Sequence, residues 1–206
     1  MFIKIKASEF VKRPIFLYRN CNKNKPKALF TGGIHHYENT IAHLYEFMDK
    51  PPSITREFDL YIIPEINPGN FLGLNRTFDV NDVPHEYRFL RDINPVSLAV
   101  DFHADFEGDR FYVYERAKQD SLCPLLFAKL GRNVPLLGKK AFEPEDLGEK
   151  TLEEFNFDLG SDYSLTTETH NRLLLPNEQI EFNKRLAKLL LETYFETHKG
   201  WVYEFH

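Results

Sequence analysis

Residues 28–38 have the sequence ALFTGGIHHYE, from which we predict the fold. It opens on a short apolar run, typical of a buried strand, and Gly32 and Gly33 end that run. A helical pattern begins directly afterwards, as it does where a strand of an α/β protein leaves its sheet. Ligands of such proteins bind beyond the carboxyl ends of the strands, and paired glycines let the backbone approach a bound group closely. The stretch therefore predicts both an α/β fold and a site at its end.

The rest of the chain repeats this alternation of short strand-like runs and longer helical patterns. Strands are expected at residues 2–6, 14–18, 28–34, 60–66, 98–102, 111–114 and 163–167. Helices are expected from residue 40, over 122–130 and from 176 to 200, and long loops over 66–96 and 135–156. The stripe of the first helix that is predicted to pack on the sheet consists of Ile41, Leu44, Tyr45 and Met48. We expect a single α/β domain over residues 1–206, with a mixed, mostly parallel, twisted sheet flanked by helices.

Charge and composition exclude several classes of protein. The chain has 26 lysines and arginines against 31 aspartates and glutamates, a net charge of -5, so no positive field attracts nucleic acid. Two cysteines, Cys21 and Cys123, are too few for a disulfide framework. No run of about 18 apolar residues occurs, and charges interrupt the N-terminal segment. We therefore expect a cytoplasmic protein without nucleic-acid or membrane partners, whose oligomeric state the sequence leaves open.

Two His-x-x-Glu pairs lie around the start of the first helix. His35 and Glu38 follow the strand end directly, where an imidazole and a carboxylate are suited to binding a metal ion. Glu38 has the alternative role of a carboxylate that caps the helix. The second pair, His43 and Glu46, lies opposite the apolar stripe, which predicts a solvated helix face rather than a site.

Residues 101–105, DFHAD, follow another apolar run and place His103 at a strand end. A lone histidine at such a position can be purely structural. Together with His35 and Glu38, however, it completes a set of two imidazoles and one carboxylate, which leaves the fourth position of a zinc ion open for water. Asp101 or a nearby carbonyl is expected to orient the His103 ring.

Residues 164–170, SLTTETH, form a further strand-end motif. A glutamate beside a metal-activated water can take its proton and pass it to a leaving amine, which makes Glu168 the candidate general base. The alternative is an exposed glutamate at a strand end. His170 is open between a supporting role, a contact with product and a surface position.

Residues 67–76, NPGNFLGLNR, follow the strand expected at 60–66. Asn-Pro followed by glycine is a turn signal whatever the function. An arginine on this loop, Arg76, is placed to donate to an oxyanion, and the alternative is a surface arginine.

Taken in chain order, these segments resemble the landmarks of the zinc carboxypeptidase superfamily, which also contains murein-peptide amidases and the aspartoacylase/succinylglutamate desuccinylase branch. The segments are GGIHHYE, NPGNFLGLNR, DFHAD and TTETH. The resemblance implies that His35, Glu38 and His103 bind one zinc ion. It implies further that Glu168 is the general base and that Arg76 polarises the scissile carbonyl.

One landmark departs from the family pattern, at the binding site for the substrate carboxylate. The family follows its polarising arginine with an Asn-Arg pair that holds this carboxylate. Here either Asn81 takes that place, with an aspartate after it, or Asn75 and the arginine after it are the pair and the polarising arginine comes from elsewhere. Asn75 and Asn81 are thus alternative substrate-binding residues, and Arg88 and Arg91 are substitute cations.

The sequence therefore predicts a zinc-dependent, metallocarboxypeptidase-like hydrolase of amide or peptide bonds, which uses a metal-activated water and a glutamate base. Two alternatives stay open. One is an N-acyl-amino-acid deacylase of the aspartoacylase/succinylglutamate desuccinylase type, and the other is a catalytically inactive binding module on the same fold. The expected partner is a peptide or an acyl-amino-acid substrate. No Gly-x-Ser-x-Gly motif occurs, which argues against a serine nucleophile.

Overall fold

The computed structural model describes residues 1–10, 12–34, 40–67, 85–105, 111–131, 151–170 and 176–199. This part of the chain contains one seven-stranded sheet with the order β1-β2-β4-β3-β5-β7-β6. The strands are β1 (Ile3–Phe10), β2 (Arg13–Arg19), β3 (Lys27–Gly32), β4 (Asp59–Ile63), β5 (Leu98–Asp105), β6 (Tyr112–Ala117) and β7 (Tyr163–His170). The central strands β4, β3, β5 and β7 are parallel, while β1, β2 and β6 pair antiparallel towards the edges. The predicted mixed sheet is confirmed, with parallel strands at its centre.

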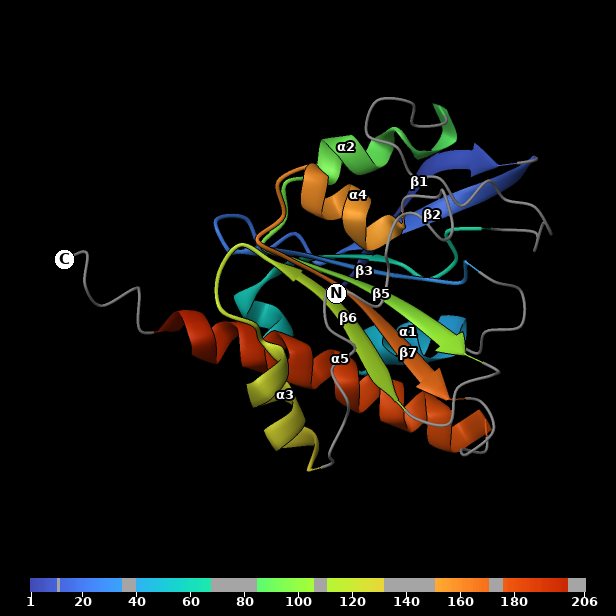
Figure 1. Ribbon diagram of the computed structural model, residues 1–206. Coiled ribbons are helices and arrows are strands. Elements are labelled where there is room, and N and C mark those ends of the chain that lie inside the picture. Colours follow the sequence, from blue (N-terminus) through green and yellow to red (C-terminus); the bar gives the residue numbers. More distant parts are fainter. Residues whose placement is uncertain are drawn as a thin grey trace, which may run out of the picture.

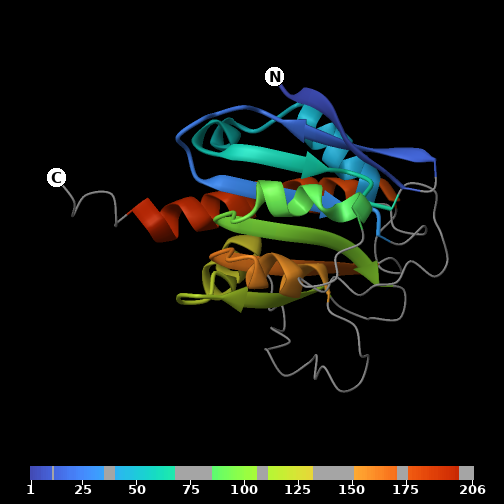
Figure 2. The ribbon, with the colours of Figure 1, turned by 90° about the horizontal axis from the view of Figure 1, so that it is seen from above.

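Helices cover both faces of the sheet (Figure 1). One face carries α1 (Thr40–Asp49), α3 (Cys123–Leu130) and α5 (Pro176–Lys199), and the other carries α2 (Phe89–Ile93) and α4 (Leu152–Asp158). Two short 3-10 helices, η1 (Ser53–Glu57) and η2 (His85–Tyr87), lie between the longer elements. The view from above shows α2 and α4 in front of the strands (Figure 2). Among the described helices, none is long and apolar enough to span a membrane.

The alternation of side chains along the strands divides the core into two clusters. Phe30 of β3 belongs to the cluster beneath α1, α3 and α5, whereas its neighbour Leu29 belongs to the one beneath α2 and α4. Phe30 packs edge-on against Phe47 and Phe102, with ring centroids 6.0 and 5.4 Å apart. Both faces of the central strands are covered, which agrees with the apolar runs at the starts of β3, β4 and β5 that the prediction relied on.

The buried face of α1 is rotated from the predicted one. Leu44 and Phe47 are buried, whereas Tyr45 is 42% exposed. His43, predicted on a solvated face, is fully buried, and its ring lies 4.7 Å from that of Phe102. The prediction was wrong because α1 packs against both the sheet and α5, which covers a wider face than a single stripe.

Two helices lie in stretches that were predicted to be loops. With five residues in α2 and seven in α4, neither is long enough to show a helical period. The start of α4 does carry a sequence signal, since Glu154 accepts a hydrogen bond from the Thr151 backbone N–H at 3.3 Å. This contact is one half of a capping box, which the Thr-x-x-Glu spacing indicates.

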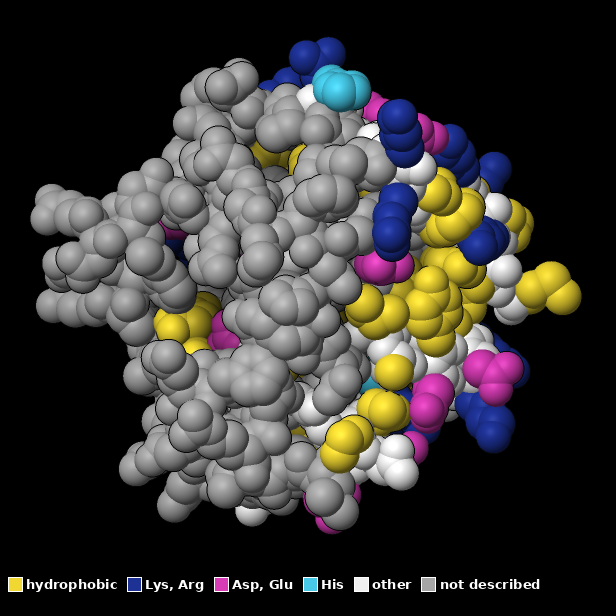
Figure 3. Space-filling model, turned by 90° about the vertical axis from the view of Figure 1, so that its right-hand side faces the viewer, with side chains coloured by type: hydrophobic (Ala, Val, Ile, Leu, Met, Phe, Trp, Pro, Cys, Tyr) yellow, Lys and Arg dark blue, Asp and Glu magenta, His cyan; other side chains and the backbone are white. Residues whose placement is uncertain are grey.

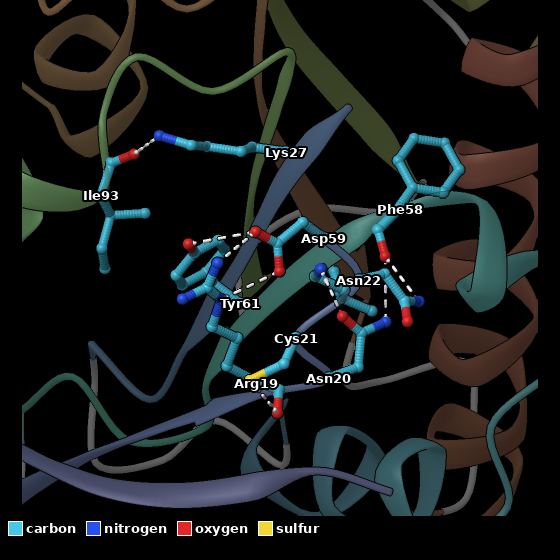
Figure 4. A network of polar contacts seen from close by, with 10 residues as sticks. Arg19, Asn20, Cys21, Asn22, Lys27, Phe58, Asp59, Tyr61 and Ile93 are labelled. Atoms are coloured by element: carbon cyan, nitrogen blue, oxygen red, sulfur yellow. Dashed lines mark hydrogen bonds and ion pairs between the residues drawn. The ribbon is translucent and has the colours of Figure 1, made fainter. Parts of the chain in front are cut away.

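A network of polar side chains lies at the amino ends of the parallel strands (Figure 4). Arg19 donates to both carboxylate oxygens of Asp59, with Nε at 2.9 Å, and this hydrogen-bonded partner raises the pKa of the guanidinium. Asn20 donates through Nδ2 to the Thr55 carbonyl at 2.8 Å, and its Oδ1 accepts from the Leu60 N–H at 2.9 Å. Side chains at the end of β2 thereby hold the start of β4.

Candidate active site

At the opposite end of the sheet, the segment that leaves β3 is bound to the segment that leaves β4. The Ile66 N–H donates to the Gly32 carbonyl at 3.0 Å, and the Asn67 N–H donates to the Gly33 carbonyl at 3.3 Å. The Asn67 side chain adds a third bond, from Nδ2 to the Ile34 carbonyl at 2.9 Å. The beginnings of the GGIHHYE and NPGN motifs therefore lie side by side.

Gly33 is required by the backbone at this point. Its φ of +69° is unfavourable for a residue with a side chain. A Cβ atom would lie 3.0 Å from the Pro64 carbonyl oxygen and 2.9 Å from Cγ1 of Ile41. The sequence suggested that the glycine pair gives room to a ligand, whereas at Gly33 the chain's own backbone occupies that room.

Strands β5 and β7 bring His103 and Glu168 together. The two strands are parallel neighbours, and their register pairs these two residues directly. The Nδ1 atom of His103 lies 3.8 Å from Oε1 of Glu168, and the side chains are only 13% and 15% exposed. An imidazole and a carboxylate thus meet in a mostly buried position near the carboxyl ends of the strands.

Asp101 holds the other side of the His103 ring. Its Oδ2 contacts Nε2 of His103, and its Oδ1 accepts a hydrogen bond from Oγ1 of Thr31 at 2.7 Å. A carboxylate at Nε2 favours the tautomer with the proton on that nitrogen, which leaves a lone pair on Nδ1, towards Glu168. This is the tautomer that a metal-binding imidazole needs, so the donor chemistry of His103 fits a zinc ion.

The described part of the chain contains only some of the predicted site residues. His103, Glu168 and Arg88 lie within it, and Arg88 is exposed at the start of α2. No group of three His, Cys, Asp or Glu side chains that could hold a metal occurs among the described residues. The predicted site residues that lie outside them are His35, Glu38, Asn75, Arg76 and Asn81. On the side of the molecule towards which β5 and β7 run, the described surface shows hydrophobic side chains with both basic and acidic side chains around them (Figure 3).

A buried carboxyl group that sequence reasoning missed lies close to these residues. Glu153 of α4 is 4% exposed and accepts a hydrogen bond from Oγ1 of Thr166 at 3.0 Å. Thr166 is the register partner of Asp101. Burial raises the pKa of the Glu153 carboxyl above its ordinary value, and the charge of Asp101 adds to the rise. In the sequence, the only signal for Glu153 is its position next to Glu154, the glutamate of the capping box of α4.

Replacing Glu153 with glutamine is expected to stabilise the protein at pH 7 and to leave its stability unchanged near pH 4. Because the pKa is raised in the folded state, the wild type is most favoured below the ordinary value of 4.5, where both states are protonated. Its stability then falls as pH rises towards the folded-state pKa, because only the unfolded carboxyl ionises freely. Glutamine does not ionise, and its oxygen can still accept from Thr166.

Urea unfolding of both proteins between pH 4 and 8 measures this difference. Glu181→Gln serves as the control because its side chain is 68% exposed. A difference between wild type and Glu153→Gln that stays constant with pH would contradict the prediction.

The comparisons with known proteins concern the fold. Neither a protein-family model nor a curated protein sequence matches the chain. A candidate metallopeptidase from Shewanella amazonensis SB2B is similar in structure, with a TM-score of 0.76 and 17% identity over 94% of this chain and 87% of that one. Bovine thrombin-activatable fibrinolysis inhibitor, solved with tick carboxypeptidase inhibitor, is also similar in structure. Its TM-score is 0.67, with 17% identity over 96% of this chain and 90% of that one.

A metallo-carboxypeptidase from Burkholderia cenocepacia gives a TM-score of 0.67 and 14% identity over 93% of this chain and 64% of that one. At such identities the likeness establishes the shared architecture and not the chemistry. The predicted resemblance is confirmed for the fold, which the chain shares with structures named as a metallopeptidase and a metallo-carboxypeptidase. The chain has the α/β fold of these three solved structures.

Proposed function

We propose that the protein is a zinc-dependent hydrolase of amide bonds in peptides. The observation that carries this proposal is the pairing of His103 with Glu168 across β5 and β7, with Asp101 on the far side of the imidazole. A hydrolase of this kind needs a fixed imidazole donor and a carboxylate base within a few ångströms of each other. The described residues supply both at the end of the sheet where α/β proteins bind ligands.

His103 would hold the metal together with His35 and Glu38, the two ligands predicted from the sequence. A bound zinc ion supplies an acidified water near neutral pH and polarises the scissile carbonyl. Asp101 keeps the ring of His103 in place and its proton on Nε2. Thr31 in turn orients the Asp101 carboxylate.

Glu168 accepts a proton from the attacking water and transfers it to the departing nitrogen. Its low exposure limits competition from bulk water for the carboxylate. Arg76 is proposed to donate to the carbonyl oxygen as negative charge develops there. No covalent acyl-enzyme is required.

Peptides with a free C-terminal carboxylate are the proposed substrates. Similar structures are named metallopeptidase and metallo-carboxypeptidase, which supports peptides over other amides. A panel of such peptides, their C-terminal amides and N-acyl amino acids separates this proposal from the deacylase alternative. Preference for N-acyl amino acids would overturn the peptidase assignment.

The test of the metal site is His103→Ala. We expect the wild type to bind about one zinc ion and the variant to bind zinc at least ~100-fold more weakly, because one of three protein ligands is lost. Zinc content by mass spectrometry and affinity by chelator competition measure the effect. His85→Ala, on the exposed surface of η2, is the control and should bind zinc as the wild type does. Unchanged zinc affinity in His103→Ala would overturn the proposed metal site.

A further inference from the structure

Asn67 belongs to none of the predicted groups of ligands or catalytic residues, yet its side chain binds the segment that leaves β3 directly before His35 in the sequence. It is 2% exposed, and its Nδ2 donates to the Ile34 carbonyl at 2.9 Å. This carbonyl belongs to the peptide group that joins residues 34 and 35. A peptide group is planar, so a bond that fixes the direction of its carbonyl also fixes the plane of that peptide group.

The three bonds between the two segments differ in what they require. Those from the Ile66 and Asn67 N–H groups to Gly32 and Gly33 use main-chain atoms only. The bond to Ile34 is the one of the three that needs a particular side chain. Its acceptor, Ile34, also directly precedes His35, the first predicted metal ligand, in the sequence. An amide donor at position 67 therefore controls the last described peptide group before His35.

The surroundings make this bond effective. Ile34 is 7% exposed, so little water is available to replace Asn67 as a donor to its carbonyl. Pro64 and Glu65 pack against Gly33, which keeps the strand end from moving away from the segment that carries Asn67. The donor and the acceptor thus lie on two segments that are already held together.

We propose that Asn67 is a positioning residue for the metal site, which holds the peptide group before His35 in the orientation that metal binding needs. The inference rests on the proposed function, because it gives Asn67 a role only if His35 binds the metal. It goes beyond the predicted site, in which the Asn-Pro segment contributes only its arginine. The role is indirect, since Asn67 acts through the backbone and touches neither metal nor substrate.

The test compares Asn67→Ala with Asn20→Ala. Asn20 also donates from its side-chain amide to main-chain carbonyls, but at the other end of the sheet. Its Nδ2 donates to the carbonyls of Thr55 and Phe58 at 2.8 and 3.1 Å (Figure 4). Both variants are expected to lose stability in urea unfolding, because each removes a donor from a buried or half-buried carbonyl. Only Asn67→Ala is expected to lose zinc affinity, by about 10- to 100-fold, as when an outer partner of a metal ligand is removed. The zinc ion itself is the probe, in competition with a fluorescent chelator.

Asn67→Asp provides the second variant in case the alanine variant does not fold. Aspartate keeps the shape of asparagine but places an acceptor instead of a donor against the Ile34 carbonyl, so its zinc affinity should fall at least as far. Far-UV circular dichroism confirms that each variant is folded during the measurement.

The outcomes separate the two proposals. If folded Asn67 variants bind zinc as tightly as the wild type while His103→Ala does not, the positioning role is overturned and the proposed function stands. A similar loss in Asn20→Ala would also overturn it, since the effect would then be one of general stability. If the wild type itself binds no zinc, both proposals fail.

Discussion

Glu168→Gln is expected to lower the turnover number for peptide hydrolysis by about 10²- to 10⁴-fold, which is the usual contribution of a general base. Glutamine has the shape of glutamate but cannot accept the proton of the attacking water. The position is fixed by the register of β5 and β7, so the variant side chain should stay beside His103. Glu168 is not a predicted ligand, and we therefore expect the zinc content to remain that of the wild type.

Initial rates on the preferred peptide and zinc content on the same samples measure both expectations. Glu181→Gln on the exposed surface of α5 is the matched control and should leave the rates unchanged. Wild-type turnover in Glu168→Gln would remove Glu168 from the mechanism. Loss of zinc together with activity would instead make this carboxylate part of the metal site.

Gly33→Ala is expected to lower the free energy of unfolding by about 3 kcal/mol, the sum of backbone strain and crowding. The φ of +69° strains any residue with a Cβ atom. The added methyl would also stand 3.0 Å from the Pro64 carbonyl oxygen and 3.1 Å from the Cα of Glu65. Both neighbours are backbone atoms, so the crowding around the added methyl group can be relieved only if the segment after β4 moves.

Gly131→Ala separates the two causes. Gly131 ends α3 with a φ of +67°, but nothing lies within 4 Å of the Cβ that alanine would add. The free energy of unfolding of Gly131→Ala should therefore fall by only about 1 kcal/mol, from backbone strain alone. Urea unfolding of the two variants and the wild type measures the difference. Equal losses in the two variants would show that the contacts with Pro64 and Glu65 do not matter.

The central strands β3 and β4 could be predicted from the sequence because burial on both faces leaves a local signature, a continuous apolar run. All seven expected runs form strands, although β1 continues four residues beyond its predicted end to Phe10. The strand order could not be predicted. β6 lies between β5 and β7 in the sequence but pairs on the outer side of β7, and no local pattern specifies this exchange. Yet it is this order that places Glu168 beside His103.

The environment of single side chains depended on contacts that no local pattern contains. The period of α1 predicts a solvated face for His43, because a local period cannot show that this helix packs against both the sheet and α5. Glu153 stands in a seven-residue helix whose sequence is mostly polar. Asn67 was visible only as part of a turn signal, since its bond to Ile34 joins residues 33 positions apart. Strand-end motifs thus locate the site, while the residues that support it require the tertiary structure.

The main-chain bonds from the Ile66 N–H to the Gly32 carbonyl and from the Asn67 N–H to the Gly33 carbonyl affect which substitutions this end of the sheet tolerates. Such bonds are insensitive to the identity of the side chains around them. Substitutions can therefore accumulate at this end of the sheet without separating the segments that leave β3 and β4. That accords with a fold shared at 14% to 17% identity with solved structures from bacteria and from cattle. A designer who wished to re-engineer specificity could therefore vary most of the surrounding positions, provided that Gly33 and Asn67 are retained.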